Sequence, residues 1–305
     1  MYVFKSLLFL DISFTFYIPR YLLIRFLFRY NSSCNSSFRF FSFLLYKLFL
    51  KKLLDIVFNQ YIIKLVIKMI GKINSIESMG LVDGPGVRFV VFMQGCPLRC
   101  KFCHNPETWK LNGNKDNYTP EELIKKILNY KPYFKRNGGV TFSGGEPLIQ
   151  KEFLLECLKL CKKNDINTCL DTAGSILDCE EILKYTDLVL LDIKGTNKKN
   201  YEEMTHGNFD NAIKFIKLCE KLNKKLWLRV VIVPGINDTK EYIYELVKFI
   251  KPIKNVEKIE FLPYHTLGVH KYEDLKITYP LKGVHDMDKD KCKKLENMLK
   301  EELKR

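Results

Sequence analysis

Residues 87–103 read VRFVVFMQGCPLRCKFC, a run of β-branched and aromatic residues that passes into a loop with three cysteines. The apolar run predicts a buried strand, and the glycine and proline after it end that strand. Cys96, Cys100 and Cys103 are spaced C-x3-C-x2-C. Thiolates this close together are typical ligands of zinc or of an iron–sulfur cluster. The stretch therefore predicts a strand that carries a metal site at its C-terminal end.

The number of thiols narrows the kind of metal site. A structural zinc normally takes four ligands, and an electron-transfer cluster normally takes four cysteines. His104 adjoins Cys103, and adjacent side chains do not readily close one tetrahedron around zinc. Three cysteines on a [4Fe–4S] cluster would leave one iron open to a substrate or cofactor. A zinc- or cluster-stapled binding protein and three unrelated buried cysteines are the alternatives at this point.

Strand-like and helix-like segments alternate along the rest of the chain. The segment 118–130 has Thr119 as N-cap, Pro120 at the first helical position and Glu122 completing a capping box. Six β/α repeats predict a parallel sheet, but they are too few to close an eight-stranded barrel. We therefore expect an α/β fold, a partial, open TIM-like (β/α)6 barrel with an N-terminal extension. The expected strands are 87–95, 139–145, 167–174, 188–195, 226–235 and 257–265, and the expected helices are 118–130, 151–163, 178–186, 210–224, 239–251 and one that begins at Lys289.

Polar residues and glycines stand at the end of every expected strand. The C-terminal ends of parallel strands meet at one face of the sheet, where α/β proteins place their sites. Any one of these residues alone would be a helix cap or a turn residue, but together they predict a single mouth. After the cysteine loop they are, in chain order, Ser143, Gly144, Gly145, Glu146, Asp171, Thr172, Asp192, Lys194, Arg229 and His265.

Residues 1–68 differ in composition from residues 69–305. They contain no glycine, 12 of the 22 phenylalanines, and ten Lys and Arg against two acidic residues. Their apolar stretches are interrupted before they reach the ~20 residues of a spanning helix. We expect a basic, aromatic-rich extension over 1–68 and a catalytic domain over 69–305. The extension is a presequence, an amphipathic membrane anchor or upstream read-through before a start at Met69, and we favour the last.

Charge and cysteine usage limit the class of protein. The net charge is +15, but residues 69–305 contribute only +7, so we expect no nucleic-acid partner. Membrane contact would be possible only through 1–68. Ten cysteines in a chain of this size predict reduced thiols in the cytoplasm, or in an organelle if 1–68 is a presequence. Cys157, Cys161 and Cys219 lie on apolar helix faces and are expected in the core.

The C-x3-C-x2-C spacing resembles the signature of the radical S-adenosylmethionine superfamily, whose members are partial (β/α)6 barrels. Five stretches, from about Gly71 onward, resemble the activases of glycyl-radical enzymes. The absence of further cysteines between Cys103 and Glu146 resembles the branch that acts on pyruvate formate-lyase. Residues 1–68 have no counterpart in that family. The five stretches are GLVDGPGVRFVVFMQGCPLRCKFCHNPETW (80–109), GGVTFSGGEPLIQ (138–150), CLDTAG (169–174), LLDIKG (190–195) and LPYHTLGVHKY (262–272).

The resemblance implies roles for these residues. Cys96, Cys100 and Cys103 would hold a [4Fe–4S] cluster, and Asp83 and Arg229 would grip the glycine loop of a protein substrate. S-adenosylmethionine would contact Phe102, Cys103, His104, Gly144, Gly145, Glu146, Asp192, Ile193, Lys194 and His265. A monovalent cation, Na⁺ or K⁺, would bind Asp171, Thr172, the carbonyl of Leu190 and Asp192.

The resemblance also implies a reaction. The reduced cluster would split S-adenosylmethionine, and the resulting 5′-deoxyadenosyl radical would take a hydrogen from a backbone glycine of pyruvate formate-lyase. Flavodoxin or ferredoxin would supply the electron, and the enzyme would be an oxidoreductase of anaerobic metabolism and a monomer. The alternative is a radical enzyme that acts on another glycyl-radical enzyme or on a small molecule.

Overall fold

A computed structural model describes residues 47–48, 51–59, 70–113 and 115–304. The chain divides into two compact units, Met1–Lys64 and Leu65–Arg305. In the first unit, the described residues are helical and exposed. Most of the predictions made for 1–68 lie outside the described residues, and the division at residue 69 stays a prediction. None of the described helices is both long and apolar enough to cross a bilayer.

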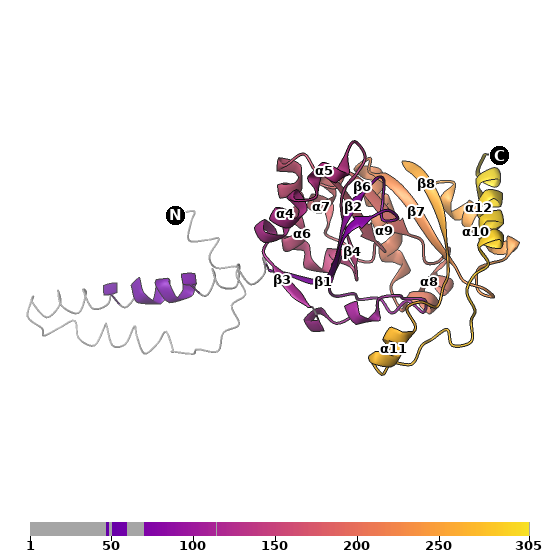
Figure 1. Cartoon of the computed structure of the whole chain (residues 1–305), viewed down its shortest axis with the longest axis horizontal. Helices are drawn as coiled ribbons and strands as arrows, with labels where there is room; N and C mark the ends of the chain where they lie inside the picture. Colours follow the sequence, from indigo (N-terminus) through magenta and orange to yellow (C-terminus); the bar gives the residue numbers. More distant parts are fainter. Residues whose placement is uncertain (1–46, 49–50, 60–69, 114, 305) are drawn as a thin grey trace, which may run out of the picture. The chain divides into compact units, whose positions relative to one another are not determined.

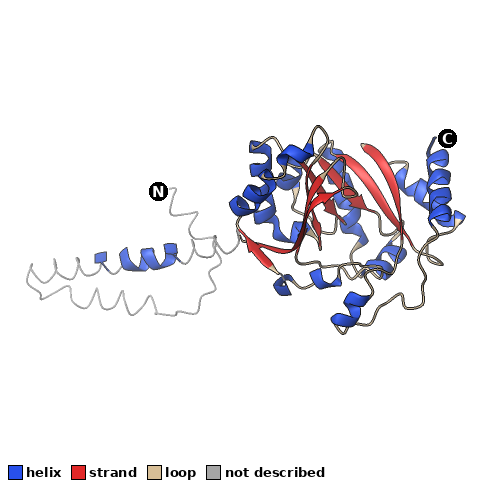
Figure 2. Ribbon diagram, in the orientation of Figure 1, coloured by secondary structure: helices blue, strands red, loops and turns tan. Residues whose placement is uncertain are grey.

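An eight-stranded sheet forms the centre of the second unit (Figures 1 and 2). The six predicted strands are parallel to their neighbours, which confirms the α/β fold and the open arrangement. Two further strands, β1 and β3, extend one edge in antiparallel pairing. In spatial order the strands are β3 (Asp116–Tyr118), β1 (Gly71–Gly80), β2 (Arg88–Met93), β4 (Gly139–Gly144), β5 (Asn167–Thr172), β6 (Leu188–Asp192), β7 (Lys225–Ile232) and β8 (Val256–Pro263).

Helices connect the parallel strands. The capping box predicted at the start of α4 is present, because Thr119 N donates to Glu122 Oε2 (2.8 Å) and Glu122 N to Thr119 Oγ1 (3.3 Å). All six predicted helices are confirmed; α5, α8 and α11 were not predicted. The α-helices are α4 (Pro120–Leu128), α5 (Lys131–Phe134), α6 (Lys151–Lys163), α7 (Glu180–Lys184), α8 (Lys198–Thr205), α9 (Phe209–Lys221), α10 (Lys240–Ile250), α11 (His270–Asp274) and α12 (Lys289–Lys304).

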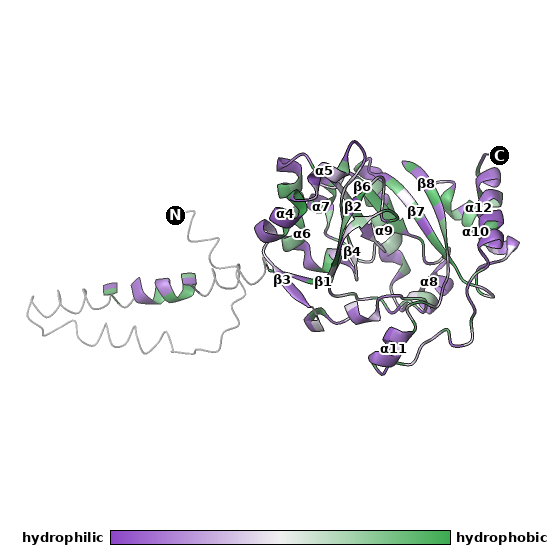
Figure 3. Cartoon of the chain, in the orientation of Figure 1, coloured by the Kyte–Doolittle hydropathy of each residue, from purple (hydrophilic) through white to green (hydrophobic). Residues whose placement is uncertain are grey.

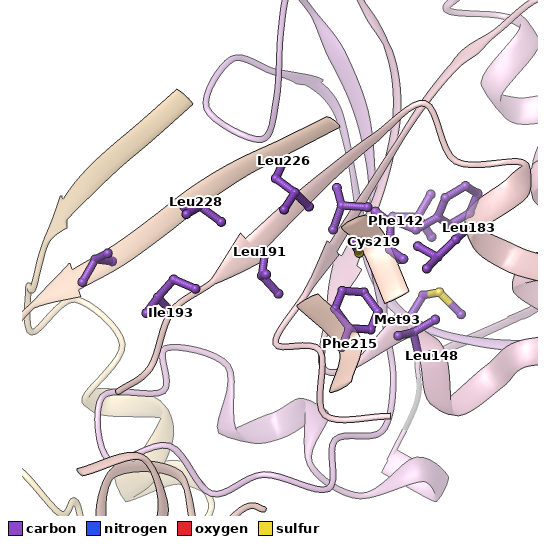
Figure 4. Close-up of a cluster of buried hydrophobic side chains, with 14 of the residues drawn as sticks. Met93, Phe142, Leu148, Leu183, Leu191, Ile193, Phe215, Cys219, Leu226 and Leu228 are labelled. Atoms are coloured by element: carbon purple, nitrogen blue, oxygen red, sulfur yellow. The ribbon is translucent and has the colours of Figure 1, made fainter. Parts of the chain in front are cut away.

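Alternation along the strands separates the apolar core from the site. Figure 3 shows the hydrophobic residues gathered on the strands and on the sheet-facing sides of the helices. One face of the strands, including Phe142, Leu191 and Leu228, packs against Phe215 and other helix residues (Figure 4). Successive side chains point to opposite faces of a strand. The other face therefore carries the remaining residues, among them the polar groups at the strand ends.

Candidate active site

The loop after β2 is held between two other parts of the chain. Gly95, with φ +96°, begins the loop, and its N–H donates to Thr108 O (2.7 Å). Further along, the N–H groups of Arg99 and Lys101 donate to the last two carbonyls of α8 (2.8 and 2.9 Å). These bonds satisfy the backbone and fix its path. The protein itself therefore holds the three cysteines in place.

Cys96, Cys100 and Cys103 lie together, packed with Leu98 and Ala173. All three thiols are free. Burial, together with the charge of neighbouring acidic groups, raises the pKa of Cys96 to about 12, and burial raises the pKa of Cys100 to about 11. Bound metal offsets both effects, because it stabilises thiolates in a site of low dielectric. Without a metal the thiols therefore stay protonated, and a metal that binds them has to displace their protons.

The arrangement of donors distinguishes a cluster from a single ion. Within the described ranges, no three His, Cys, Asp or Glu side chains form a group that could hold one metal ion. A structural zinc requires such a group. In an iron–sulfur cube, the cysteines bind different irons and need not converge on one point. Three soft thiols without a fourth therefore fit the cube better than a closed zinc site.

Gly144 and Gly145 bring the end of β4 against the cysteine loop. Glu146 N donates to Gly95 O (2.8 Å), and Gly145 N donates to Met93 O (2.9 Å). A Cβ on Gly144, whose φ is +103°, would lie 2.4 Å from Met93 N, and one on Gly145 would lie 2.2 Å from Gly95 O. Only glycine allows such an approach. We predicted that these glycines admit a cofactor, and the structure shows that they also admit the backbone of the cysteine loop.

Glu146 is buried, with 1% of its surface exposed. Its carboxylate accepts hydrogen bonds from Thr172 Oγ1 (2.7 and 2.9 Å), Ala173 N (3.2 Å), Ser175 Oγ (3.4 Å) and Leu148 N (3.3 Å). Burial outweighs these donors and raises its pKa from 4.5 to about 7. Glu146 thus ties β5 to the end of β4. Its predicted contact with S-adenosylmethionine stays a prediction.

The raised pKa of Glu146 predicts how stability depends on pH. The folded protein keeps a proton that the unfolded chain releases between pH 4.5 and about 7. The stability from this group is therefore complete below pH 4.5 and is lost as the pH rises through 7. Between pH 5 and 8, Glu146→Gln should gain about 3 kcal/mol in free energy of unfolding relative to the wild type. Urea unfolding of the metal-free protein at both pH values measures this gain. The exposed Glu241→Gln serves as control, and equal pH slopes for Glu146→Gln and wild type would refute the prediction.

An ionic network joins the C-terminal ends of β4, β5 and β6 to Arg229, which lies within β7 opposite Asp192. Arg229 on β7 pairs with Asp171 on β5 and, through Nε, with Asp192 Oδ1 on β6 (3.1 Å). Lys194 Nζ bonds Asp192 Oδ2 (3.0 Å), and Ser143 Oγ on β4 donates to Asp171 Oδ2 (2.6 Å). Side chains from four of the six predicted strands therefore meet in one network.

The same network bears on the predicted cation site. Burial disfavours the charge on Asp192, but Lys194 and Arg229 outweigh it and hold its pKa below the usual range. Of the expected cation ligands, Asp171 and Asp192 are thus already paired with a guanidinium, while the Thr172 hydroxyl bonds Glu146. An added ion would have to share these carboxylates. The cation site stays a prediction.

The loop between β1 and β2 places Asp83 near the network. Thr141 Oγ1 donates to the carbonyl of Asp83 (2.6 Å) and accepts from Arg88 Nε (3.0 Å). Burial and the charge of Asp171 raise the pKa of Asp83 to about 6, against the opposing charge of Arg229. Asp83 and Arg229 were predicted to act together, and the charge of Arg229 does lower the pKa of Asp83. Arg88, which is fully buried, was missed, although an arginine inside an apolar strand is an unusual signal.

Two predicted residues from distant segments stack at the mouth. The rings of His104 and His265 lie 4.0 Å apart, and His104 Nε2 bonds His265 O (2.8 Å). His265 Nδ1 is buried and has no partner among the described residues. Lys194 Nζ lies 5.2 Å from the centre of the Phe102 ring. Ile193 differs, because its side chain packs in the core (Figure 4), so only its backbone can face the mouth.

The helix α11 ties the C-terminal segment to the cysteine loop. Tyr272 OH donates to Cys103 O (2.9 Å), and Lys271 Nζ bonds Glu107 Oε1 (2.6 Å). Trp109, whose ring meets Tyr272 edge-on (5.8 Å), hydrogen-bonds the Cys103 thiol and opposes the effect of burial on its pKa. The sequence prediction missed these supporting residues, although all lie inside the stretches that carry the family resemblance.

Comparison with known proteins agrees with this geometry. The profile of the Radical SAM superfamily matches residues 90–250. The chain is 56% identical over 237 residues to the pyruvate formate-lyase-activating enzyme of Clostridium pasteurianum, covering 77% of this chain and 99% of that protein. It is 46% identical over 232 residues to the enzyme of that name from Staphylococcus epidermidis, covering 73% and 92%. The crystal structure of Streptococcus suis SuiB bound to precursor peptide SuiA has the same fold, with a TM-score of 0.55 at 20% identity over 70% of this chain and 45% of that one. The chain belongs to the radical SAM superfamily and, within it, to the family of the pyruvate formate-lyase-activating enzymes.

Proposed function

We propose that this enzyme activates pyruvate formate-lyase by forming a radical on one of its backbone glycines. The observation that carries the proposal is the loop with Cys96, Cys100 and Cys103 at the mouth of the open barrel, three free thiols that no fourth cysteine joins within the described part of the chain. When bound there, a [4Fe–4S] cluster and S-adenosylmethionine together supply a 5′-deoxyadenosyl radical able to take hydrogen from glycine. The chain's own residues bind and orient the groups, and they exclude water.

Several groups at the mouth suit S-adenosylmethionine. The ammonium of Lys194 suits a carboxylate, and the unpartnered Nδ1 of His265 suits a polar atom of the adenosine. Burial opposes the charge of Lys194, but Asp192 outweighs burial and keeps its pKa above the usual range, so it is a cation at neutral pH. Phe102, His104, Gly144, Gly145 and Glu146, with the backbone of Ile193, complete the proposed site.

Asp83 and Arg229 are proposed to bind the glycine loop of the protein substrate. Arg229 is oriented by its two carboxylate partners, so it can present N–H donors in a fixed direction. The backbone of Asp83 is held by Thr141, which Arg88 orients in turn. No general base is needed, because the hydrogen leaves glycine as an atom and not as a proton.

The remaining expectations extend this proposal. The free thiols of the described residues suit a reducing compartment such as the cytoplasm. Flavodoxin or ferredoxin as electron donor, a monomeric state and a bound Na⁺ or K⁺ follow from the family resemblance alone.

The substrate is tested by electron paramagnetic resonance. Anoxically reconstituted enzyme, S-adenosylmethionine and a reductant are mixed with pyruvate formate-lyase or, in parallel, with a different glycyl-radical enzyme. We expect the doublet of a glycyl radical, and formate-lyase activity, only in the first mixture. A radical only in the second mixture, or 5′-deoxyadenosine without any glycyl radical, would assign the enzyme another substrate.

A further inference from the structure

Tyr201 buries a hydroxyl that finds no hydrogen-bond partner among the described residues. The side chain belongs to α8 and is 1% exposed, and its OH is one of three buried polar atoms in this condition. Buried hydroxyls are nearly always bonded, because an unmet hydrogen bond is costly inside a protein. An orphan of this kind therefore points to a partner that is not part of the chain.

The position of Tyr201 is next to the cysteine loop. The N–H groups of Arg99 and Lys101, which flank Cys100, donate to the last two carbonyls of α8, one turn beyond Tyr201. A Cβ on Gly207 would lie 2.4 Å from Leu98 Cδ2 and 3.4 Å from Tyr201 Cε1. The ring thus packs beneath the loop that carries the thiols.

The charges around the hydroxyl are those of the site. Burial raises the pKa of Tyr201 to about 12; the charge of Lys194 opposes this rise, and Cys100, Glu146 and Cys96 add to it. Lys194 bonds Asp192 (3.0 Å), and an ammonium cannot accept a hydrogen bond. Of the other groups, the Glu146 carboxylate already accepts hydrogen bonds from four donors. The acceptors left for this hydroxyl are therefore on the side of the thiols.

A water molecule is the alternative partner. A cavity of about 10 Å³ adjoins Tyr201, which is near the minimum for one water. A buried water needs two to four polar partners. Besides Tyr201, the polar residues of the lining are Asp192 and Lys194, which already bond each other (3.0 Å), while Phe209, Ile216, Phe249 and the remaining lining residues are apolar. A water here would have to share groups that are already paired, so the lining favours another partner.

We propose that Tyr201 donates a hydrogen bond to the iron–sulfur cluster at its Cys100 corner. This inference rests on the function proposed above. Hydrogen bonds to the sulfurs of a cluster stabilise its reduced, more negative state and so raise its reduction potential. Tyr201 would thus make the cluster easier for the electron donor to reduce.

The variant Tyr201→Phe keeps the ring and removes only the hydroxyl. Wild type and variant are reconstituted anoxically without S-adenosylmethionine, and their clusters are titrated with a reductant under electron paramagnetic resonance. At the potential that half-reduces the wild-type cluster, we expect the ratio of reduced to oxidised cluster in the variant to be at most about one fifth of the wild-type ratio. After exchange into D₂O, the wild type should show a coupled exchangeable proton that the variant lacks. The control is Tyr185→Phe, at the opposite end of β6, which should match the wild type.

Metal-free protein supplies the second measurement. Because the hydroxyl has no partner there, Tyr201→Phe should have a Tm no lower than that of the wild type. A lower Tm would show that the hydroxyl is already bonded inside the protein and would overturn the inference. An intact cluster with unchanged potential and unchanged proton coupling would also overturn it, while the proposed function would stand. A wild type that takes up no iron would overturn both.

Discussion

Cys100→Ser should abolish iron uptake and lower the yield of glycyl radical at least ~1,000-fold. A cluster held by two thiolates and a hydroxyl loses a soft ligand that iron–sulfur chemistry requires. Cys100 is buried, and among the described residues its cluster contains no cysteine besides Cys96 and Cys103 that could take its place. Iron analysis after anoxic reconstitution measures the uptake, and electron paramagnetic resonance measures the radical.

The matched control is Cys219→Ser. Cys219 is buried as well, but it belongs to α9 and its thiol packs in the hydrophobic core. This variant should keep its iron and lose about 1–3 kcal/mol of stability through the buried hydroxyl. Full iron content in Cys100→Ser would contradict the assignment of the ligands.

Gly144→Ala should lower the free energy of unfolding by about 2–5 kcal/mol and prevent cluster uptake. The φ of +103° costs a residue with Cβ about 1–2 kcal/mol. The added Cβ would lie 2.4 Å from the backbone nitrogen of Met93, which cannot move aside cheaply, so overpacking adds about 1–3 kcal/mol. The strain acts on the strand that leads into the cysteine loop.

Gly235→Ala separates the two contributions. Gly235 has φ +73° but nothing within 4 Å of its would-be Cβ. This variant should therefore lose only the backbone part, about 1–2 kcal/mol, and keep its iron. Urea unfolding of both variants makes the comparison, and equal losses in the two would show that the close packing of β4 against the loop is unimportant.

The parallel strands and their helices were predictable because each is a strong local signal. Parallel strands are buried on both faces and read as continuous apolar runs, as in 188–192. The strand β1 was missed because it lies near the sheet edge and mixes buried Ile73 with exposed polar residues such as Glu77. The helix α8 was missed because it is short and mostly polar.

The residues of the site also divide into those that the sequence predicts and those that it does not. The thiols, Gly144 and Gly145 and the charged strand ends belong to recognisable stretches. Arg88 was missed although an arginine inside an apolar strand is a signal, whereas Tyr201 was not predictable, since its importance lies in its burial and in a hydroxyl without a partner among the described residues. A tyrosine within KKNYEEMT looks like an ordinary residue of a surface helix until the fold places it beneath the cysteine loop.

The most direct test of the account is the metal content and spectrum of anoxically reconstituted protein. The account predicts about four iron and four sulfide per chain, and a reduced-state electron paramagnetic resonance spectrum that changes when S-adenosylmethionine is added, because one iron is open to it. Protein that carries zinc or no metal at the three cysteines, or a cluster whose spectrum ignores S-adenosylmethionine, would contradict it.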